Sequence, residues 1–254
     1  MNSHSKFALL VVASTLVVAV TSVDAYDTVE VSDAGSVVGV VRLTEKAPDV
    51  ETLTVSRDFD VCAKEEKLAE SLLVTEGGGI RNVVASLTGI EKGKAWSSST
   101  PMLDQEGCRF EPHVLLVQAG ESFDIGNNDD ILHMIRAHSG ANPAFNVGQP
   151  KFNKAFSKVL HNPEIIKVTC DVHDWMDAFL VVQAHPYYAI SDADGLFTLD
   201  HVPPGTYELS LWHERLGLKT GTVTVDPNSE TKVLIKLKLR SDTMQIAELE
   251  RRKF

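Results

Sequence analysis

The chain has 254 residues, of which 43% are hydrophobic, and its formal net charge at pH 7 is -11. This length permits one large domain or two smaller ones, each with its own core. The acidic balance argues against nucleic acid as a partner and favours docking to a basic protein surface.

The first 25 residues have the pattern of a secretory signal peptide. Lys6 supplies a positive charge, an apolar run extends from Phe7 to Val20, and Val23 and Ala25 are small residues suited to a cleavage site. A membrane anchor is the alternative, but the run is short for a spanning helix, which needs about 20 apolar residues. We therefore expect residues 1–25 to be removed. The mature protein is then periplasmic or otherwise secreted, with no membrane span.

The mature chain is predicted to be nearly all β. Two short runs rich in β-branched residues, Ser36–Leu43 and Ile80–Leu87, are expected to open a first unit that covers residues 26–183. Residues 49–79 between them are largely polar and charged and contain Cys62. This segment is interpreted as an insertion in an N-terminal extension of the first unit.

Five further strands are expected in this unit: His113–Gln118, Ser122–Gly126, Leu132–Ala137, Glu164–Cys170 and Ala178–Gln183. Residues 142–162 are predicted to be irregular because Pro143, Gly148 and Pro150 interrupt them. Many short strands separated by turn residues indicate a β-sandwich or barrel.

A second unit is expected at residues 184–240. Its predicted strands are Tyr187–Ile190, Leu196–Leu199, Thr206–Trp212, Thr220–Val225 and Lys232–Leu239. The link at residues 184–186 is too short to be flexible, so the two units are expected to pack together. Residues 241–254 fit either a frayed tail or a short helix capped by Ser241 or Asp242.

One short loop of the first unit carries three potential metal donors. Cys170, His173 and Met176 have the spacing C-x2-H-x2-M directly after a predicted strand. A thiolate, an imidazole and a thioether belong to the donor set of blue-copper sites, which also contain a second histidine. His133 follows the turn-forming run Asn127-Asn128-Asp129-Asp130 and is the best candidate for it. The alternative is that all four are ordinary packing residues.

The three cysteines and a further histidine leave questions open. Three is an odd number, so if Cys170 binds metal in an oxidising compartment, Cys62 and Cys108 are free to form a disulfide. Alternatively, both stay reduced and buried. His113 lies near the start of a predicted strand. It is either an additional group near the metal or an ordinary histidine at the sheet edge.

The region from Gly107 to Gln183 resembles a cupredoxin. The likeness rests on Phe110-Glu111-Pro112, the turn Ala119-Gly120-Glu121, Asn128-Asp129, His133 and a C-x2-H-x2-M loop of the amicyanin length. It implies a Greek-key sandwich that binds one type-1 copper. Its equatorial ligands would be His133, Cys170 and His173, with Met176 as the axial ligand.

Three positions differ from the cupredoxin pattern. Met134 stands where cupredoxins often have an asparagine that ties the ligand loops together. Val172 and Asp174 stand where amicyanin-like loops usually have prolines. Because such neighbours tune a metal centre, the reduction potential cannot be inferred from the resemblance.

The second unit contains another signature. Asp192-Ala193-Asp194-Gly195-Leu196-Phe197 and Val202-Pro203-Pro204-Gly205-Thr206-Tyr207 resemble the D-x-x-G-x-F and V-P-P-G-x-Y patterns of carboxypeptidase regulatory-like, transthyretin-like sandwiches. Such modules are generally accessory, and no peptidase zinc motif accompanies this one. Asp192 and Asp194 either bind calcium or, more simply, form the turn.

These features predict an exported copper protein that carries single electrons between redox protein partners. The alternative is a non-redox copper-binding, storage or interaction module. An enzyme of the copper oxidase or nitrite reductase class is not expected, because it needs further histidine pairs and the sequence has no H-x-H repeat.

Overall fold

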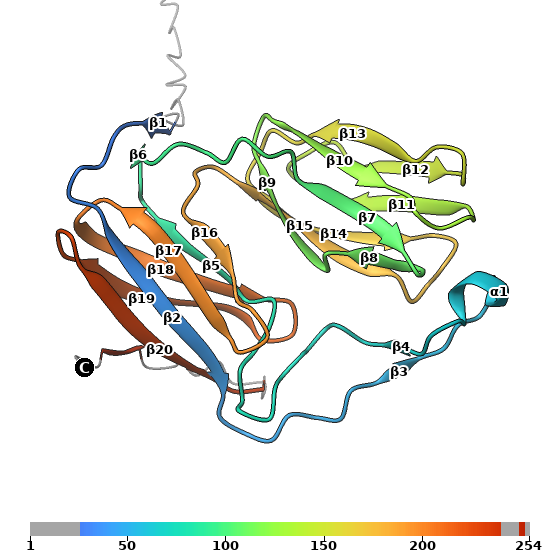
Figure 1. Cartoon of the computed structure of the whole chain (residues 1–254), viewed down its shortest axis with the longest axis horizontal. Coiled ribbons are helices and arrows are strands. Elements are labelled where there is room, and N and C mark those ends of the chain that lie inside the picture. Colours follow the sequence, from blue (N-terminus) through green and yellow to red (C-terminus); the bar gives the residue numbers. More distant parts are fainter. Residues whose placement is uncertain (1–25, 240–248, 252–254) are drawn as a thin grey trace, which may run out of the picture.

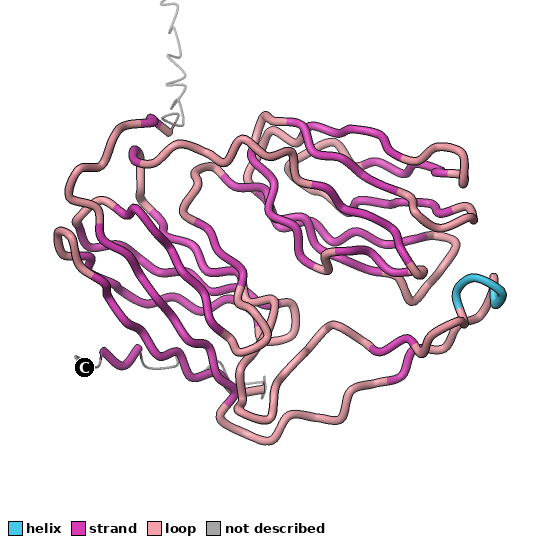
Figure 2. The backbone as a smooth tube through the Cα atoms, in the orientation of Figure 1, coloured by secondary structure: helices cyan, strands magenta, loops and turns pink. Residues whose placement is uncertain are grey.

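A computed structural model describes residues 26–239 and 249–251, and they form two β-sandwiches that lie side by side (Figures 1 and 2). The chain is nearly all β, as its sequence predicts. The expected leader, residues 1–25, lies outside the described residues. Of the expected tail or helix at 241–254, only Leu249–Arg251 is described, and it is a strand, β21. No helix within the described residues has the length and hydropathy that a membrane span requires.

The first sandwich contains nine strands in two sheets. Its five-stranded sheet has the order β12-β11-β14-β15-β9, and its four-stranded sheet has the order β13-β10-β7-β8. The strands are β7 (Met102–Glu106), β8 (Arg109–Glu111), β9 (Val114–Gln118), β10 (Ser122–Gly126), β11 (His133–His138), β12 (Phe145–Gln149), β13 (Ala155–Val159), β14 (Glu164–Cys170) and β15 (Asp177–Gln183).

Alternating side chains build the core between these sheets. In β11, Ile135 and Ala137 are buried while Arg136 and His138 are exposed, because successive side chains of a strand point to opposite faces. Phe110 and Phe123 from the facing sheet join them in one apolar cluster. This packing holds rigid the end of the sandwich from which the predicted ligands project.

The irregular segment expected at residues 142–162 instead contains two strands. β12 and β13 each lie at the edge of a sheet, where one side of the strand needs no ladder partner. Their side chains are mostly exposed or half-buried, so the hydrophobic signal is weak. Pro143 and Pro150 fall outside the strands, which explains why they do not interrupt them.

The second sandwich is built from two four-stranded sheets with orders β16-β5-β18-β19 and β17-β2-β20-β21. Its further strands are β2 (Gly35–Leu43), β5 (Val84–Thr88), β16 (Tyr188–Ile190), β17 (Leu196–Val202), β18 (Gly205–His213), β19 (Gly217–Val225) and β20 (Glu230–Leu237). β2 pairs in parallel with β20 and antiparallel with β17.

This pairing corrects the expected boundary at residues 183 and 184. β2 and β5 were expected in the first unit, but each is an inner strand of the second sandwich. Alternation reveals which face of a strand is buried and does not reveal the partner strand, so proximity in sequence is a poor guide here. The second sandwich is therefore discontinuous, and β7 to β15 form a contiguous unit inserted between its parts.

The two sandwiches pack through a small apolar interface. Val114, Phe179 and Val181 from the first contact Val84 of the second in one buried cluster. The rings of Phe179 and Trp212 meet edge to face with centroids 5.1 Å apart. The expectation that the two units pack together is confirmed.

A long segment, residues 49–71, reaches from the second sandwich to one end of the first (Figure 1). We call it the arm. It consists of β3 (Thr52–Leu53), the short helix α1 (Phe59–Cys62) and β4 (Lys67–Leu68), which pairs with β3. The predicted disulfide between Cys62 and Cys108 is confirmed and fixes the arm to the first sandwich. The remaining pair, β1 (Asp27–Thr28) and β6 (Lys92–Gly93), joins the N-terminal segment to the chain beyond β5.

Candidate metal centre

Strand register brings the loops that carry the predicted ligands to one end of the first sandwich. Cys170 is the last residue of β14 and lies opposite Ile135 of β11. Residues two apart in a strand point to the same face, so His133 lies on the same face of the sheet as Ile135 and Cys170. The main-chain N–H of Met134 donates to Cys170 Sγ at 3.4 Å, and that of Asp171 donates to the Met134 carbonyl at 2.9 Å.

A tight turn returns the chain so that His173 faces the same point. The N–H of Met176 donates to the His173 carbonyl at 3.0 Å, and the N–H of Cys170 donates to the Met176 carbonyl at 3.1 Å. The whole loop is thereby closed on itself between β14 and β15. Three residues after Cys170, His173 is directed back over the sulfur, with Nδ1 3.6 Å from Sγ.

Buried amides hold the loop that leads into β11. Asn127 donates to the carbonyls of Ile131 and Gln149 at 3.1 and 2.9 Å, while its own side-chain oxygen accepts the N–H of Asp129. Gln105 bonds the Gln149 side chain and the Gly126 carbonyl. Because these amides are buried and, apart from Gln105 Oε1, hydrogen-bonded, the loop has little freedom to move His133.

Three donor atoms converge on one point. Among the described residues, His133, Cys170 and His173 form a buried group suited to holding a metal ion. Cys170 Sγ lies 3.8 Å from His133 Nδ1 and 3.6 Å from His173 Nδ1, and the two Nδ1 atoms are 3.0 Å apart. His133 and His173 have no exposed surface, and Cys170 is 3% exposed.

These distances fit a three-coordinate N2S site. Donors about 2.0 to 2.3 Å from a shared ion and about 120° apart are roughly 3.5 to 3.8 Å from one another. Both sulfur–nitrogen distances agree with that range. The nitrogen–nitrogen distance corresponds to a narrower angle of roughly 100° for the same bond lengths. Two imidazoles and one thiolate are the equatorial donors of a type-1 copper site, so the residues present suit that ion.

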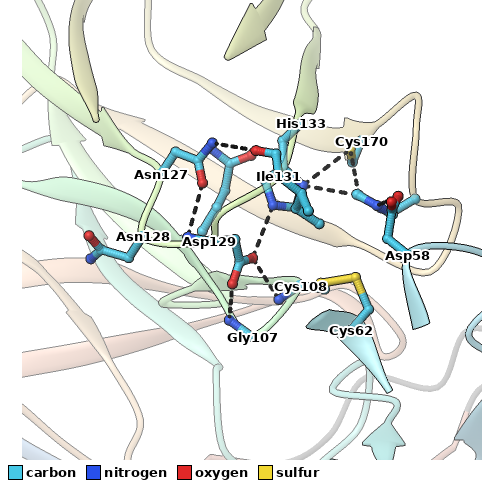
Figure 3. A network of polar contacts seen from close by, with 12 residues as sticks. Asp58, Cys62, Gly107, Cys108, Asn127, Asn128, Asp129, Ile131, His133 and Cys170 are labelled. Carbon is cyan, nitrogen blue, oxygen red and sulfur yellow. Dashed lines mark hydrogen bonds and ion pairs between the residues drawn. A yellow bond between two sulfur atoms is a disulfide. The ribbon is translucent and has the colours of Figure 1, made fainter. Parts of the chain in front are cut away.

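Each histidine bonds a carboxylate through its other ring nitrogen, and Figure 3 shows the contact between His133 and Asp129. His133 Nε2 lies 3.0 Å from Asp129 Oδ2, and His173 Nε2 lies 3.0 Å from Asp58 Oδ2. Because carboxylates accept, each Nε2 carries a hydrogen, so each Nδ1 has a lone pair whenever its ring is neutral, the form that binds a metal. Metal-binding histidines commonly have this arrangement, which fixes the tautomer and ring orientation.

The surroundings of Cys170 favour its thiolate. Burial raises the pKa of the thiol, but hydrogen bonds with His133 and His173 and from the main-chain N–H of Met134 lower it to about 5. The same contacts act on His133: burial lowers its pKa, and the Asp129 and Cys170 bonds outweigh burial and raise it. A thiolate is the form of cysteine that binds metals, so Cys170 is suited to that role near neutral pH.

The remaining residues of the loop lie beside this group. Met176 is 2% exposed and belongs to the core of the first sandwich. The Trp175 ring lies with its centroid 5.0 Å from that of His173, and its Nε1 donates to the Cys108 carbonyl at 3.1 Å. Trp175 thus covers one side of His173 and joins the loop to the residue that carries the disulfide. The assignment of Met176 as axial ligand stays a prediction.

His113 lies apart from the donor group. It is buried at the boundary of the two sandwiches, where Nε2 lies 2.5 Å from Glu214 Oε1 and its ring packs on Phe179. Burial lowers the pKa of His113, but the hydrogen bond and charge of Glu214 outweigh burial and raise it. Of the two possibilities left open by the sequence, the structure favours the second. His113 directly precedes the edge strand β9, and it links the two sandwiches.

Sequence reasoning missed both carboxylates at the centre. Asp129 lay within the predicted turn, four residues before His133, and this spacing was the signal that could have indicated it. Asp58 has no such signal, because it lies in a polar stretch far from the ligand loop in sequence. Only the path of the arm places it beside His173.

The comparisons with known proteins are local or weak. Residues 161–233 match the family described as polysaccharide lyase family 4, domain II. This stretch is under half of the chain, and it begins in the first sandwich and ends within β20. It corrects the resemblance of the second unit to a transthyretin-like domain, since a different family of β domains matches there. No curated protein matches the chain.

Solved structures similar to the chain include copper proteins. A Cu-containing nitrite reductase from Thermus scotoductus SA-01 is 18% identical with a TM-score of 0.31, covering 35% of this chain and 24% of the reductase. A purple cupredoxin from Nitrosopumilus maritimus is 17% identical with a TM-score of 0.29, over 33% of this chain and 99% of its own.

A mutant of amicyanin in its reduced Cu(I) form at pH 4 is 19% identical with a TM-score of 0.31, over 39% of this chain and 98% of its own. The chain thus spans about a quarter of the reductase and nearly all of the two small proteins. At these TM-scores the likenesses carry no weight for function, which has to be argued from the side chains.

The turn at Asp192 has a structural explanation. Asp192 Oδ1 accepts the main-chain N–H groups of Asp194 and Leu196, both at 2.9 Å. This is the pattern by which aspartate stabilises a tight turn. The turn explanation therefore accounts for this carboxylate without a bound calcium ion.

Proposed function

We propose that the chain is an exported type-1 copper-binding protein that carries single electrons between redox protein partners. One observation supports this above all: the Nδ1 atoms of His133 and His173 face each other 3.0 Å apart beside Cys170 Sγ. Lone pairs so close repel each other unless a cation or a proton lies between them. The donor set matches the ion that this function needs.

The chain's own residues would hold the site in one geometry. Copper in such a site takes up and releases one electron. Asp129 and Asp58 fix the orientation of the two imidazoles, and the loop closed by Cys170, His173 and Met176 fixes the thiolate. Because the donors are buried and bonded, little rearrangement accompanies a change of charge at the centre.

The partner proposed for this carrier is a basic redox protein in the same exported compartment. The net charge of -11 would steer such a partner toward the chain, and the effect would weaken as salt is added. The disulfide between Cys62 and Cys108 suits an oxidising compartment. We propose an electron carrier rather than an enzyme.

A spectroscopic titration tests the proposal. Cu(II) added to the purified protein is expected to bind one to one and to produce a visible band near roughly 600 nm, from charge transfer between the thiolate and copper. The Cys170→Ala variant is expected to lack this band. A native protein that stays colourless and binds no copper with Cys170 reduced would contradict the proposal.

A second candidate is a non-redox copper-binding, storage or interaction module. The full burial of both histidines favours it, since no edge of a ligand is presented to a partner. Voltammetry separates the two candidates: reversible reduction at one fixed potential supports the carrier, and irreversible loss of copper on reduction supports storage or delivery.

A further inference from the structure

We propose that the arm is a lid on the metal centre, latched by Asp58, and that copper enters and leaves when this latch opens. The inference rests on the proposed function for the identity of the ion. The lid would control access to Cys170 in the metal-free protein as well. The arm comes from outside the sandwich that supplies the donors, which makes it an added cover.

Asp58 provides the latch. Asp58 Oδ2 is 3.0 Å from His173 Nε2, and the Asp58 backbone is left-handed, with φ of 49°. Aspartate tolerates this conformation better than most residues. Asp58 precedes α1 but makes no side-chain capping bond there, so its carboxylate is free to accept from His173. A second polar contact, Ser56 Oγ to Asp174 Oδ1 at 3.4 Å, lies beside it.

Asp58 also separates the centre from solvent. Its side chain is 40% exposed, while the His173 side chain that it contacts has no exposed surface. Water therefore lies on the outer side of Asp58, and the donor group lies on the inner side. Val55 and Val61 of the arm pack against the apolar cluster that contains Cys170. Lifting this part of the arm would uncover His173 first.

The arm is held at few points, so it can open without unfolding either sandwich. Besides the latch and the Ser56–Asp174 contact, its polar and covalent anchors are the disulfide at Cys62, the bond from Arg109 to the Leu68 carbonyl at 2.9 Å, the Arg109–Glu70 ion pair, and the bond from Arg215 to Ser71 at 3.2 Å. Its own hairpin pairs only two residues from each strand. Within the arm only Cys62 and Lys67 are buried, and segments with few buried residues open at a lower free energy than the core does.

The disulfide limits how far the lid can open. Cys62 lies four residues beyond Asp58, so the intact bond keeps the latch near His173 even when the hydrogen bond breaks. Reduction of this bond would remove the arm's covalent anchor to the first sandwich. Copper exchange is therefore expected to be slow in an oxidising compartment and faster once the disulfide is lost.

Thiol labelling in metal-free protein tests the lid directly. Cys170 is the free cysteine of an oxidised chain with three cysteines, so the rate of its reaction with an aromatic disulfide reagent at pH 8.5 reports access to the centre. Asp58→Gly removes the carboxylate and permits the same backbone. Loss of one hydrogen bond to a charged group predicts labelling about tenfold to a hundredfold faster. Asp60→Ala, in the helix that directly follows Asp58, is the control and is expected to label at the native rate.

A second pair of measurements keeps the two proposals separate. The half-time for transfer of Cu(I) to a chelator is expected to shorten in Asp58→Gly and further in a variant with Cys62→Ser and Cys108→Ser. Asp58→Asn, which keeps an acceptor, is expected to lie between native and Asp58→Gly. Equal labelling rates in native, Asp58→Gly and the double cysteine variant would overturn the lid, whether or not copper binds. Faster labelling without copper binding in any form would support the lid and overturn the proposed function.

Discussion

Oδ2 of Asp129 lies 3.0 Å from Nε2 of His133 and accepts the main-chain N–H of Cys108 at 2.8 Å. The other carboxylate oxygen accepts the N–H of Gly107, also at 2.8 Å. One side chain thus ties a candidate copper ligand to the turn that carries the disulfide (Figure 3). Since Cys62 on the arm is joined to Cys108, both histidines are connected to the arm, His173 directly and His133 through Asp129.

Replacement of this carboxylate is expected to weaken copper binding without abolishing it. Asp129→Asn should lower copper affinity about 10- to 100-fold, because the partner that orients His133 is changed. It should also lower the free energy of unfolding by about 1–3 kcal/mol, since the buried N–H of Cys108 and the partly buried N–H of Gly107 lose a charged acceptor. Competition with a chelator and urea unfolding measure the two effects. The control is Asp130→Asn, whose side chain is 87% exposed; equal affinities in the two variants would contradict the role of Asp129.

Met176→Leu is expected to change the electronic properties of the centre more than its stability. If the thioether is a weak axial ligand, copper should still bind, while the reduction potential and the visible spectrum shift. Leucine fills a similar volume, so the free energy of unfolding should fall by less than about 1.5 kcal/mol. Voltammetry and absorption spectra check this, with Met102→Leu, 46% exposed, as the control. An unchanged potential in Met176→Leu would show that Met176 is a packing residue.

The His113–Glu214 pair is expected to make stability depend on pH. The raised pKa of His113 in the folded protein means that this contribution is fully present below the ordinary histidine pKa of about 6.5 and is lost as pH rises through the raised value. Glu214→Gln should therefore lower the free energy of unfolding by about 1–3 kcal/mol near pH 5.5, and by less at pH 9.

Urea unfolding of native and variant protein at both pH values measures this difference. Glu70, Asp177 and His213 also act electrostatically near His113, and subtracting the native curve from the variant curve removes most of their own titration. The exposed Glu230 serves as the control position. A cost of Glu214→Gln that is the same at the two pH values would argue against a charged pair.

Loss of the disulfide is expected to destabilise the protein as a whole. The bond closes a loop with a sequence separation of 46, for which the restriction of the unfolded chain corresponds to roughly 4 kcal/mol. A variant with Cys62→Ser and Cys108→Ser should lose about that much by urea unfolding at constant slope. A loss below about 1 kcal/mol would mean that the disulfide does little to constrain the unfolded chain.

Local patterns predicted most of the strands and the donor group. Cys170, His173 and the start of β11 could be placed because one tight loop and one antiparallel pair bring them together. The edge strands β12 and β13 were missed because their alternation includes few buried apolar residues. Strand partners at long range were also missed, as β2 shows, because the period of a strand carries no information about its neighbour.

The carboxylates of the centre show the same limit at the level of side chains. Asp129 is close to His133 in sequence, so its role follows from a local turn. Asp58 reaches His173 only because the arm crosses from one sandwich to the other, a path set by two strands that bracket it, β2 and β5. A residue whose role depends on such a crossing leaves no pattern in a single sequence.

The discontinuous second sandwich also sets the order in which the molecule can be finished during synthesis. β7 to β15 are made in one run and can form the first sandwich while later residues are still being added. β2, made early, has to wait for β17 and β20, which are among the last strands produced. Both ends of the arm are anchored by strands that wait in this way. We therefore expect the metal centre of newly made chains to be open and accessible at first. The arm is expected to cover it only when β17 and β20 have paired with β2.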